Sequence, residues 1–248
     1  MIYLKTPEEI ALLRASNQLV GKTLGEMAKH IRPGISTLEL DRIAEDFIRS
    51  HGALPAFKGY EGFPNALCVS VNDVVVHGIP SAKCILKEGD VVSIDCGTKL
   101  DGFCGDSCYT FCVGEVSDDV KHLLKTTKES LYKAIQTSIV GRRIGDIGYT
   151  VQQYCESQGY GIVREFVGHG IGRELHEDPE VPNYRTNRRG HRLAAGMAIA
   201  IEPMVNQGTD EISLAGNKWT VYTKDGKLSA HYENTVIVTD DEPLIVTL

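Results

Sequence analysis

The predicted order of elements repeats along the chain, and this repeat limits the possible folds more than any other sequence feature. Two amphipathic helices precede a strand-rich segment, and the same order then returns. Because the strands gather in runs beside the helices, the pattern predicts an α+β fold. We expect a single domain over residues 1–248, made of two similar halves at about 1–114 and 115–248, with a cleft between them.

Capping residues and apolar periodicity place the helices. Thr6 and Glu9 form a capping box around Pro7, which suits the first position of a helix. Helices are predicted over about residues 7–33, 36–52, 118–139 and 146–158.

Turn residues divide the remaining segments into strands. Asp101 and Gly102 predict a two-residue turn in a long hairpin over residues 90–114, and Asp225 and Gly226 predict another over residues 219–238. Further strands are expected over residues 66–79, 161–168 and 196–205.

Two carboxylates interrupt strands that are otherwise apolar. Asp95 follows the run VVSI, and Glu202 lies in MAIAIEPMV, which is apolar on both faces. Strands of this kind are usually buried on both faces. A buried ionised carboxylate is very costly unless a cation or strong hydrogen-bond donors meet it. These positions therefore predict a cation site.

Two more carboxylates are candidates for the same site. With a two-residue turn, Asp95 lies opposite Cys108, and Asp106 is its diagonal neighbour on the same face. Asp106 also suits a turn, because it follows a glycine. For Glu233, a solvated strand face is about as good an interpretation as a functional one.

Three histidines end predicted strands or follow them closely. His169 lies between two glycines, which we interpret as clearing space for a ligand nitrogen to meet an ion, and His176 follows seven residues later. A single loop histidine is more often structural, and His77 has an ordinary strand-end interpretation. Four carboxylates with one imidazole suit two divalent first-row ions. His77 and His176 would then not be metal ligands and could make polar contacts with the reacting groups.

Charge and composition exclude several classes of protein. The formal net charge is -7, and no cluster of Lys and Arg exceeds two or three residues, so nucleic acid is disfavoured as a main ligand. No signal peptide and no run of about 18 apolar residues is seen, so we expect a cytosolic protein without a membrane partner. Seven cysteines, an odd number, fit reduced thiols better than disulfides.

Six motifs in order resemble the type I methionine aminopeptidases, which have the pita-bread metallopeptidase fold of family M24. The motifs are HGIP at 77–80, SIDCG at 93–97, GFCGDS at 102–107, GHGIGRELHEDP at 168–179, IEPM at 201–204 and ENTV at 233–236. Any one motif is weak, but six in this order and spacing are specific, and they cover nearly the whole chain.

The resemblance implies a role for each matching residue. The metal ligands would be Asp95, Asp106, His169, Glu202 and Glu233, holding two divalent ions of cobalt, iron, manganese, zinc or nickel, with Asp106 and Glu233 bridging them. Glu202 would accept a proton from the attacking water, His176 would stabilise the tetrahedral intermediate, and His77 would contact the scissile amide.

A pocket for the methionine side chain is also implied. Its lining would be Tyr60, Phe63, Cys68, His77, His176 and Trp219. Many relatives have Gly and Phe where Glu174 and Leu175 stand, and His where Cys104 stands. Leu175 removes an aromatic contact from the pocket, so the strength of methionine selection is open.

The implied activity is removal of the N-terminal methionine from nascent chains with a small second residue. The implied setting is the cytoplasm near the ribosome, with the protein a monomer. The alternatives are an Xaa-Pro peptidase of the same fold and a non-catalytic pita-bread module that binds peptides.

Overall fold

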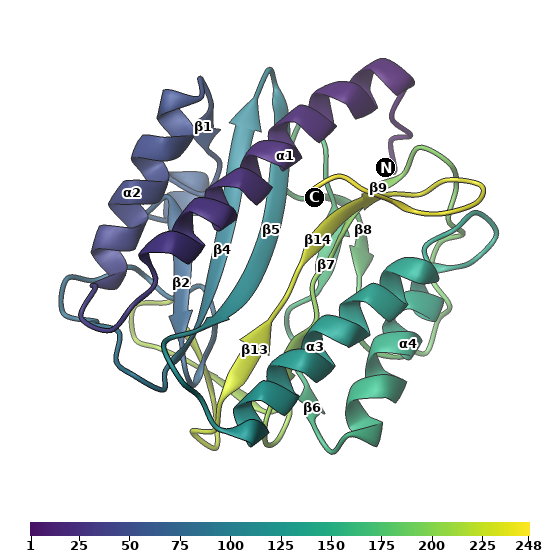
Figure 1. The fold of residues 1–248 in the computed structure, drawn as a ribbon. Coiled ribbons are helices and arrows are strands. Elements are labelled where there is room, and N and C mark those ends of the chain that lie inside the picture. Colours follow the sequence, from purple (N-terminus) through teal and green to yellow (C-terminus); the bar gives the residue numbers. More distant parts are fainter.

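The computed structural model describes all residues from 1 to 248 and shows helices packed over antiparallel sheets (Figure 1). The helices are α1 (Pro7–His30), α2 (Thr37–Ser50), α3 (Asp118–Gln136) and α4 (Ile144–Ser157), with a short 3-10 turn at Tyr60–Gly62. Helix α1 crosses the long strands β4 (Val91–Leu100) and β5 (Phe103–Cys112). The predicted α+β class is confirmed.

The other strands are short. They are β1 (Leu54–Pro55), β2 (Leu67–Val71), β3 (Val74–Val76), β6 (Gly161–Ile162), β7 (Gly168–Gly170), β8 (Glu177–Val181), β9 (Ala198–Ile201), β10 (Met204–Asn206), β11 (Ile212–Leu214), β12 (Val221–Thr223), β13 (Ser229–His231), β14 (Asn234–Ile237) and β15 (Leu244–Ile245). One sheet joins β1, β4 and β2 with β5 at the side of β4, and another has the order β15-β14-β9-β7-β8.

The capping signals located the helices to within a few residues. The Thr6 side chain accepts a hydrogen bond from the Glu9 amide, and the Glu9 carboxylate accepts one from the Thr6 amide, which is the predicted capping box. Leu13 and Val20 on the apolar face of α1 are fully buried. Burial of such a side chain contributes about 1.5 to 3 kcal/mol, so packing on the sheet stabilises this helix more than its cap does.

The long hairpin has the predicted register. Leu100 pairs with Phe103, so Asp101 and Gly102 alone make the turn, and both have positive φ, at 49° and 81°. Two residues of this kind suit the right-handed twist of the strands. Asp95 therefore pairs with Cys108, as predicted.

The second predicted hairpin, over residues 219–238, is wrong. Strand β12 pairs with β11 and β3, whereas β13 pairs with β10. The turn at Asn72 and Asp73 lies between β12 and β13. The Thr223 amide donates to the Asp73 carbonyl, and the Ser229 amide donates to the Asn72 carbonyl. Of the predicted strand 161–168, only β6 and the first residue of β7 are extended, and β8 was not predicted.

Buried apolar side chains form two main clusters, one under each helix pair. One cluster of 16 residues runs from Leu19 to Val113, and the other of 22 residues lies mostly between Val120 and Val238. Backbone contacts between β5 and the segment before β14 join them, including a 2.9 Å hydrogen bond from the Glu233 amide to the Cys108 carbonyl. The division near residue 114 stays a prediction.

All seven cysteines are free, as predicted. None of the helices combines the length and the apolar character that crossing a bilayer requires.

Candidate active site

The hairpin of β4 and β5 supplies the first two carboxylates. Asp106 pairs with Gly97, two positions along β4 from Asp95, so the two aspartates are diagonal neighbours on one face. Asp106 is only 4% exposed, and its interpretation as a solvent-facing turn residue is therefore wrong. The pKa of Asp95 is raised to about 7, first by burial, with the nearby Glu202 carboxylate adding to the effect.

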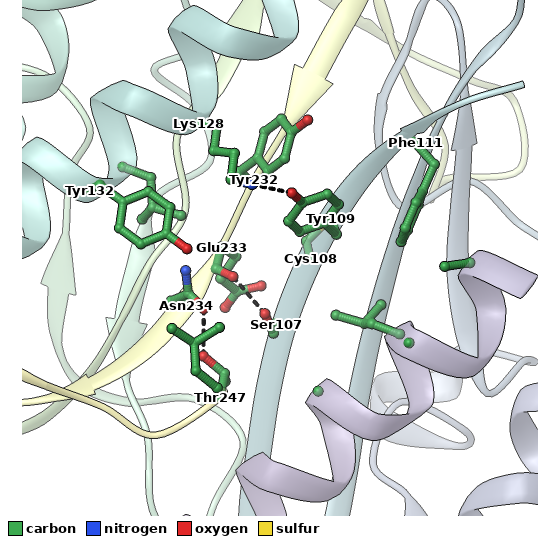
Figure 2. A pocket seen from close by; sticks show the side chains of 16 residues that line it. Ser107, Cys108, Tyr109, Phe111, Lys128, Tyr132, Tyr232, Glu233, Asn234 and Thr247 are labelled. Atoms are coloured by element: carbon green, nitrogen blue, oxygen red, sulfur yellow. Dashed lines mark hydrogen bonds between the residues drawn. The ribbon is translucent and has the colours of Figure 1, made fainter.

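Contacts with the end of the chain bring Glu233 to the same place. Figure 2 shows Ser107 pointing to the backbone of Glu233, where its hydroxyl donates to the carbonyl at 2.5 Å. The Thr235 hydroxyl donates to the Asp106 carbonyl at 2.9 Å. Glu233 is 3% exposed, which rules out the solvated-face interpretation.

His169 lies on β7 with one ring nitrogen turned toward the carboxylates. Its Nδ1 lies 2.8 Å from the Gly170 carbonyl, which can only accept a hydrogen bond, so Nδ1 carries the proton. Its Nε2 is 3.7 Å from a carboxylate oxygen of Asp106 and 3.7 Å from one of Glu202. This leaves the Nε2 lone pair free for an ion.

The prediction that the glycines beside His169 clear space for a bound ion is wrong. A β-carbon at Gly168 would lie 2.3 Å from the Ala200 carbonyl oxygen, and one at Gly170 would lie 2.1 Å from that of Asp178. They permit neighbouring backbone segments to approach closely, instead of clearing space for a ligand.

Glu202 directly follows Ile201, the last residue of β9. The sequence-based prediction had placed it inside a strand. The preceding strand is fully buried, as expected, and the Glu202 carbonyl accepts a hydrogen bond from Asn183 at 3.1 Å. The Glu202 carboxylate lies between two imidazoles, with His231 Nε2 3.6 Å from its second oxygen. Burial raises the pKa of Glu202 to about 8.

Several buried polar atoms in this cluster have no hydrogen-bond partner. They are one oxygen each of Asp95, Asp106 and Glu233, and His231 Nε2. Burial raises the pKa values of Asp106 and Glu233, and the neighbouring carboxylates raise them further. Burial lowers the pKa of His169 to about 3, so this imidazole is neutral.

These unpaired groups fit a bound cation. Ligand atoms of Asp106, His169 and Glu233 all lie within 4.8 Å of one another, close enough to surround one ion. Positive charge there would offset the cost of burying the carboxylates.

A pocket opens beside the cluster and contains every residue predicted for the site. Its lining comprises Phe57, Tyr60, Glu61, Phe63, Cys68, His77, Asp95, Asp106, His169, Leu175, His176, Glu202, Trp219 and Glu233. Trp219 packs edge-on against Phe63 with ring centres 5.2 Å apart and lies 6.3 Å from the His77 ring. The wall is therefore apolar next to a strongly polar floor.

His176 is held by a tyrosine. The Tyr60 hydroxyl lies 2.8 Å from His176 Nδ1, and burial lowers the pKa of His176, which favours its neutral form. When the hydroxyl donates to Nδ1, the proton of the neutral ring is on Nε2.

Sequence reasoning missed three residues at or near the site. Phe57 and Glu61 line the pocket, and His231 faces Glu202. His231 had a sequence signal, because it stands two positions before Glu233 in a strand-like run and so could share its face. Phe57 and Glu61 had none, since they lie in an irregular segment.

Comparison with known proteins identifies the family. The family model for metallopeptidase family M24 matches residues 11–240. The chain belongs to metallopeptidase family M24. A methionine aminopeptidase of Clostridium acetobutylicum is 51% identical over 248 residues, which cover 100% of this chain and 99% of the relative. The family consists of metallopeptidases, and the cluster of Asp106, His169 and Glu233 fits the use of a divalent metal.

Solved structures of the M24 type confirm the pita-bread fold. A methionine aminopeptidase of Rickettsia prowazekii superposes with a TM-score of 0.98 at 40% identity, with all of both chains covered. An Xaa-Pro dipeptidase of Bacillus anthracis has a TM-score of 0.76 at 25% identity, and the match covers 98% of this chain but 61% of that chain.

Proposed function

We propose that the chain removes the N-terminal methionine from proteins and peptides whose second residue is small. The observation that carries this proposal is the position of an apolar pocket wall directly beside a buried cluster of unpaired carboxylates. The relatives named methionine aminopeptidase, at about half identity over the whole chain, support the same activity.

Five residues would hold two divalent ions. Asp95, Asp106, His169, Glu202 and Glu233 would together hold the ions. Four carboxylates offset the charge of two dications. When bound, the ions would lower the pKa of a water and polarise the scissile carbonyl. The physiological metal could be cobalt, iron, manganese, zinc or nickel.

The remaining polar residues would handle protons and orientation. Glu202 would accept the proton of the attacking water, a role open to it because bound ions would keep its carboxylate ionised. The Nε2–H of His176 would donate to the carbonyl oxygen as negative charge develops there. His77 would contact the scissile amide, since it lines the same pocket as the carboxylates and its ring lies 6.3 Å from that of Trp219.

The apolar wall would select the side chain to be removed. Phe63, Cys68 and Trp219 belong to or pack against one buried cluster that also contains Leu175. Aromatic rings and sulfur suit a thioether, which is flexible and polarisable. Leu175 is 4% exposed and adds an aliphatic surface to this wall.

A peptide assay tests the proposal. Metal-loaded protein is expected to release methionine from a peptide that begins Met-Ala and to leave a peptide that begins Ala-Ala uncut. A Met-Pro peptide, whose second residue is also small, is included for comparison with the Xaa-Pro peptidases. Release of the first residue only from Met-Pro would favour an Xaa-Pro peptidase. With full metal occupancy confirmed, failure to cut any of the three would favour a non-catalytic peptide-binding module.

The setting of the reaction is part of the proposal. The substrates would be the N-termini of newly made chains near the ribosome in the cytoplasm, and the enzyme would act as a monomer.

Replacing Tyr60 with phenylalanine is expected to lower kcat about 2-fold to 10-fold for a Met-Ala peptide. The reason is loss of the hydrogen bond that fixes the proton of His176 on Nε2, worth about 0.5 to 1.5 kcal/mol. Steady-state kinetics would show the loss in kcat with little change in KM. Tyr3→Phe, at an exposed tyrosine, is the matched control. An unchanged kcat in Tyr60→Phe would refute this role.

A further inference from the structure

Six of the twelve arginines of the chain lie in two segments of the second half that run side by side. This arginine face consists of Arg142, Arg143, Arg185, Arg188, Arg189 and Arg192. They come from two segments, the one that leads into α4 and the loop that follows β8. No lysine lies in either segment.

Backbone hydrogen bonds hold these two segments side by side. Residues 143 and 192 form an antiparallel bridge, the Leu193 amide donates to the Arg142 carbonyl at 2.8 Å, and the Gly145 amide donates to the Arg189 carbonyl at 3.0 Å. The Arg143 guanidinium also donates to the Gly190 carbonyl at 2.9 Å. The two segments that carry the arginines are therefore held together by backbone hydrogen bonds.

Most of the charge on this face is not neutralised within the protein. The arginine side chains at 142, 185, 188 and 192 make no ion pair, and only Arg189 does, with Asp146 at 3.0 Å. Two other carboxylates lie nearby, of which Asp178 pairs with the terminal amine and Glu180 is exposed. Six guanidinium groups thus outnumber three carboxylates, in a chain whose net charge is -7.

The shape and lining of the face indicate the kind of partner. Arg185, Arg188 and Arg189 surround a hollow of about 320 Å³ beside Tyr149, which is 45% exposed and lies 5.8 Å from the Arg185 guanidinium. An exposed ring beside arginines suits stacking of an unpaired base, and guanidinium groups match phosphate oxygens in two-pronged hydrogen bonds. The exposed Asn187 offers an amide to a ribose hydroxyl.

We propose that the arginine face is a docking surface for single-stranded RNA. A membrane is disfavoured, because only one hydrophobic residue lines the hollow. An acidic protein is disfavoured, because one hydrophobic residue lines the hollow, whereas the buried core of a protein interface is mostly apolar. The sequence argument against nucleic acid rested on net charge, which averages over all faces.

The test is fluorescence anisotropy of a labelled, mixed-sequence 15-nucleotide single-stranded RNA with the metal-loaded full chain, over a series of salt concentrations. A triple variant, Arg185→Ala with Arg188→Ala and Arg189→Ala, is expected to bind at least about 10-fold more weakly. Removing three phosphate contacts should reduce the slope of log affinity against log salt by about 2.

The matched control removes three arginines that are exposed and make no ion pair elsewhere, through Arg14→Ala, Arg32→Ala and Arg42→Ala. This control should bind RNA like the unaltered chain, and both triple variants should retain kcat/KM on a short neutral Met-Ala peptide and the melting temperature. These readouts separate the proposal from the aminopeptidase activity.

Three outcomes would overturn the proposal. They are no RNA binding by the unaltered chain at low salt, an equal loss in the control triple variant, and tighter binding of anionic phosphatidylglycerol vesicles or polyglutamate than of RNA through the same arginines. Weaker binding of DNA of the same sequence would support it, since DNA lacks the 2′-hydroxyl.

Discussion

Glu202→Gln is expected to lower kcat for a Met-Ala peptide at least about a thousandfold while the protein stays folded. A positioned proton acceptor contributes about 10² to 10⁴ to the rate, and this glutamate would also hold an ion. The amide has the shape of the carboxylate but can neither take the proton nor supply the negative charge.

Stability gives a second readout for the same variant. Burial has raised the pKa of Glu202 to about 8, so the metal-free native protein bears the cost of this buried group. Metal-free Glu202→Gln is therefore expected to melt at a temperature equal to or above that of the unaltered chain. Glu211→Gln, at an exposed glutamate paired with Lys224, removes the same charge and should leave kcat unchanged. Retention of more than a tenth of kcat in metal-loaded Glu202→Gln would contradict the role.

Divalent metal is expected to stabilise the protein more at pH 8 than at pH 5.5. In the metal-free protein, burial raises the pKa of Asp95 to about 7 and that of Glu202 to about 8, and Asp106 and Glu233 are raised as well. Unfolded carboxyls titrate near pH 4, so the native state binds more protons between about pH 4 and 8. The stability of the metal-free protein therefore falls as the pH rises through this range.

Metal binding acts in the opposite direction. The ions require ionised ligands, so their binding displaces the retained protons and strengthens with pH. At a free metal concentration 100 times Kd, the stabilisation is about 2.7 kcal/mol, or roughly 5 to 11 °C in Tm for a chain of this size. Calorimetry at both pH values, with and without a chelator, measures the effect.

A ligand variant supplies the control for this prediction. Asp106→Asn combined with Glu233→Gln should remove the gain in Tm from metal and flatten the pH dependence of the metal-free protein. An equal metal-induced shift at pH 5.5 and pH 8 in the unaltered chain would be inconsistent with buried, proton-bearing ligands.

Local signals predicted the local structure well. The capping box at Thr6 and the two-residue turn at Asp101 depend on neighbours in sequence, and both are present as predicted. The second hairpin failed because its turn residues are also compatible with strands that pair elsewhere. The segments before and after Asp225 found partners in β3 and β10, which no local pattern specifies.

The candidate site shows the same division. The apolar surroundings of Asp95 and Glu202 in the sequence indicate the cost of burying them. For Asp106 and Glu233 the local pattern left a solvated interpretation open, and only the resemblance to the M24 family assigned them to the site. The glycines around His169 looked functional, but the structure shows that they admit neighbouring backbone.

The sequence by itself determined the helices, the turn that aligns the two aspartates, and the presence of carboxylates that need a cation. These follow from interactions a few residues long and from the cost of burying charge. The tertiary structure brought Glu233 beside Asp106, as the family resemblance implied. It alone decided that Tyr60 contacts His176 and that two arginine-bearing segments run side by side. Each of these contacts joins residues remote in the chain, and their pairing is set by how whole sheets and helices pack.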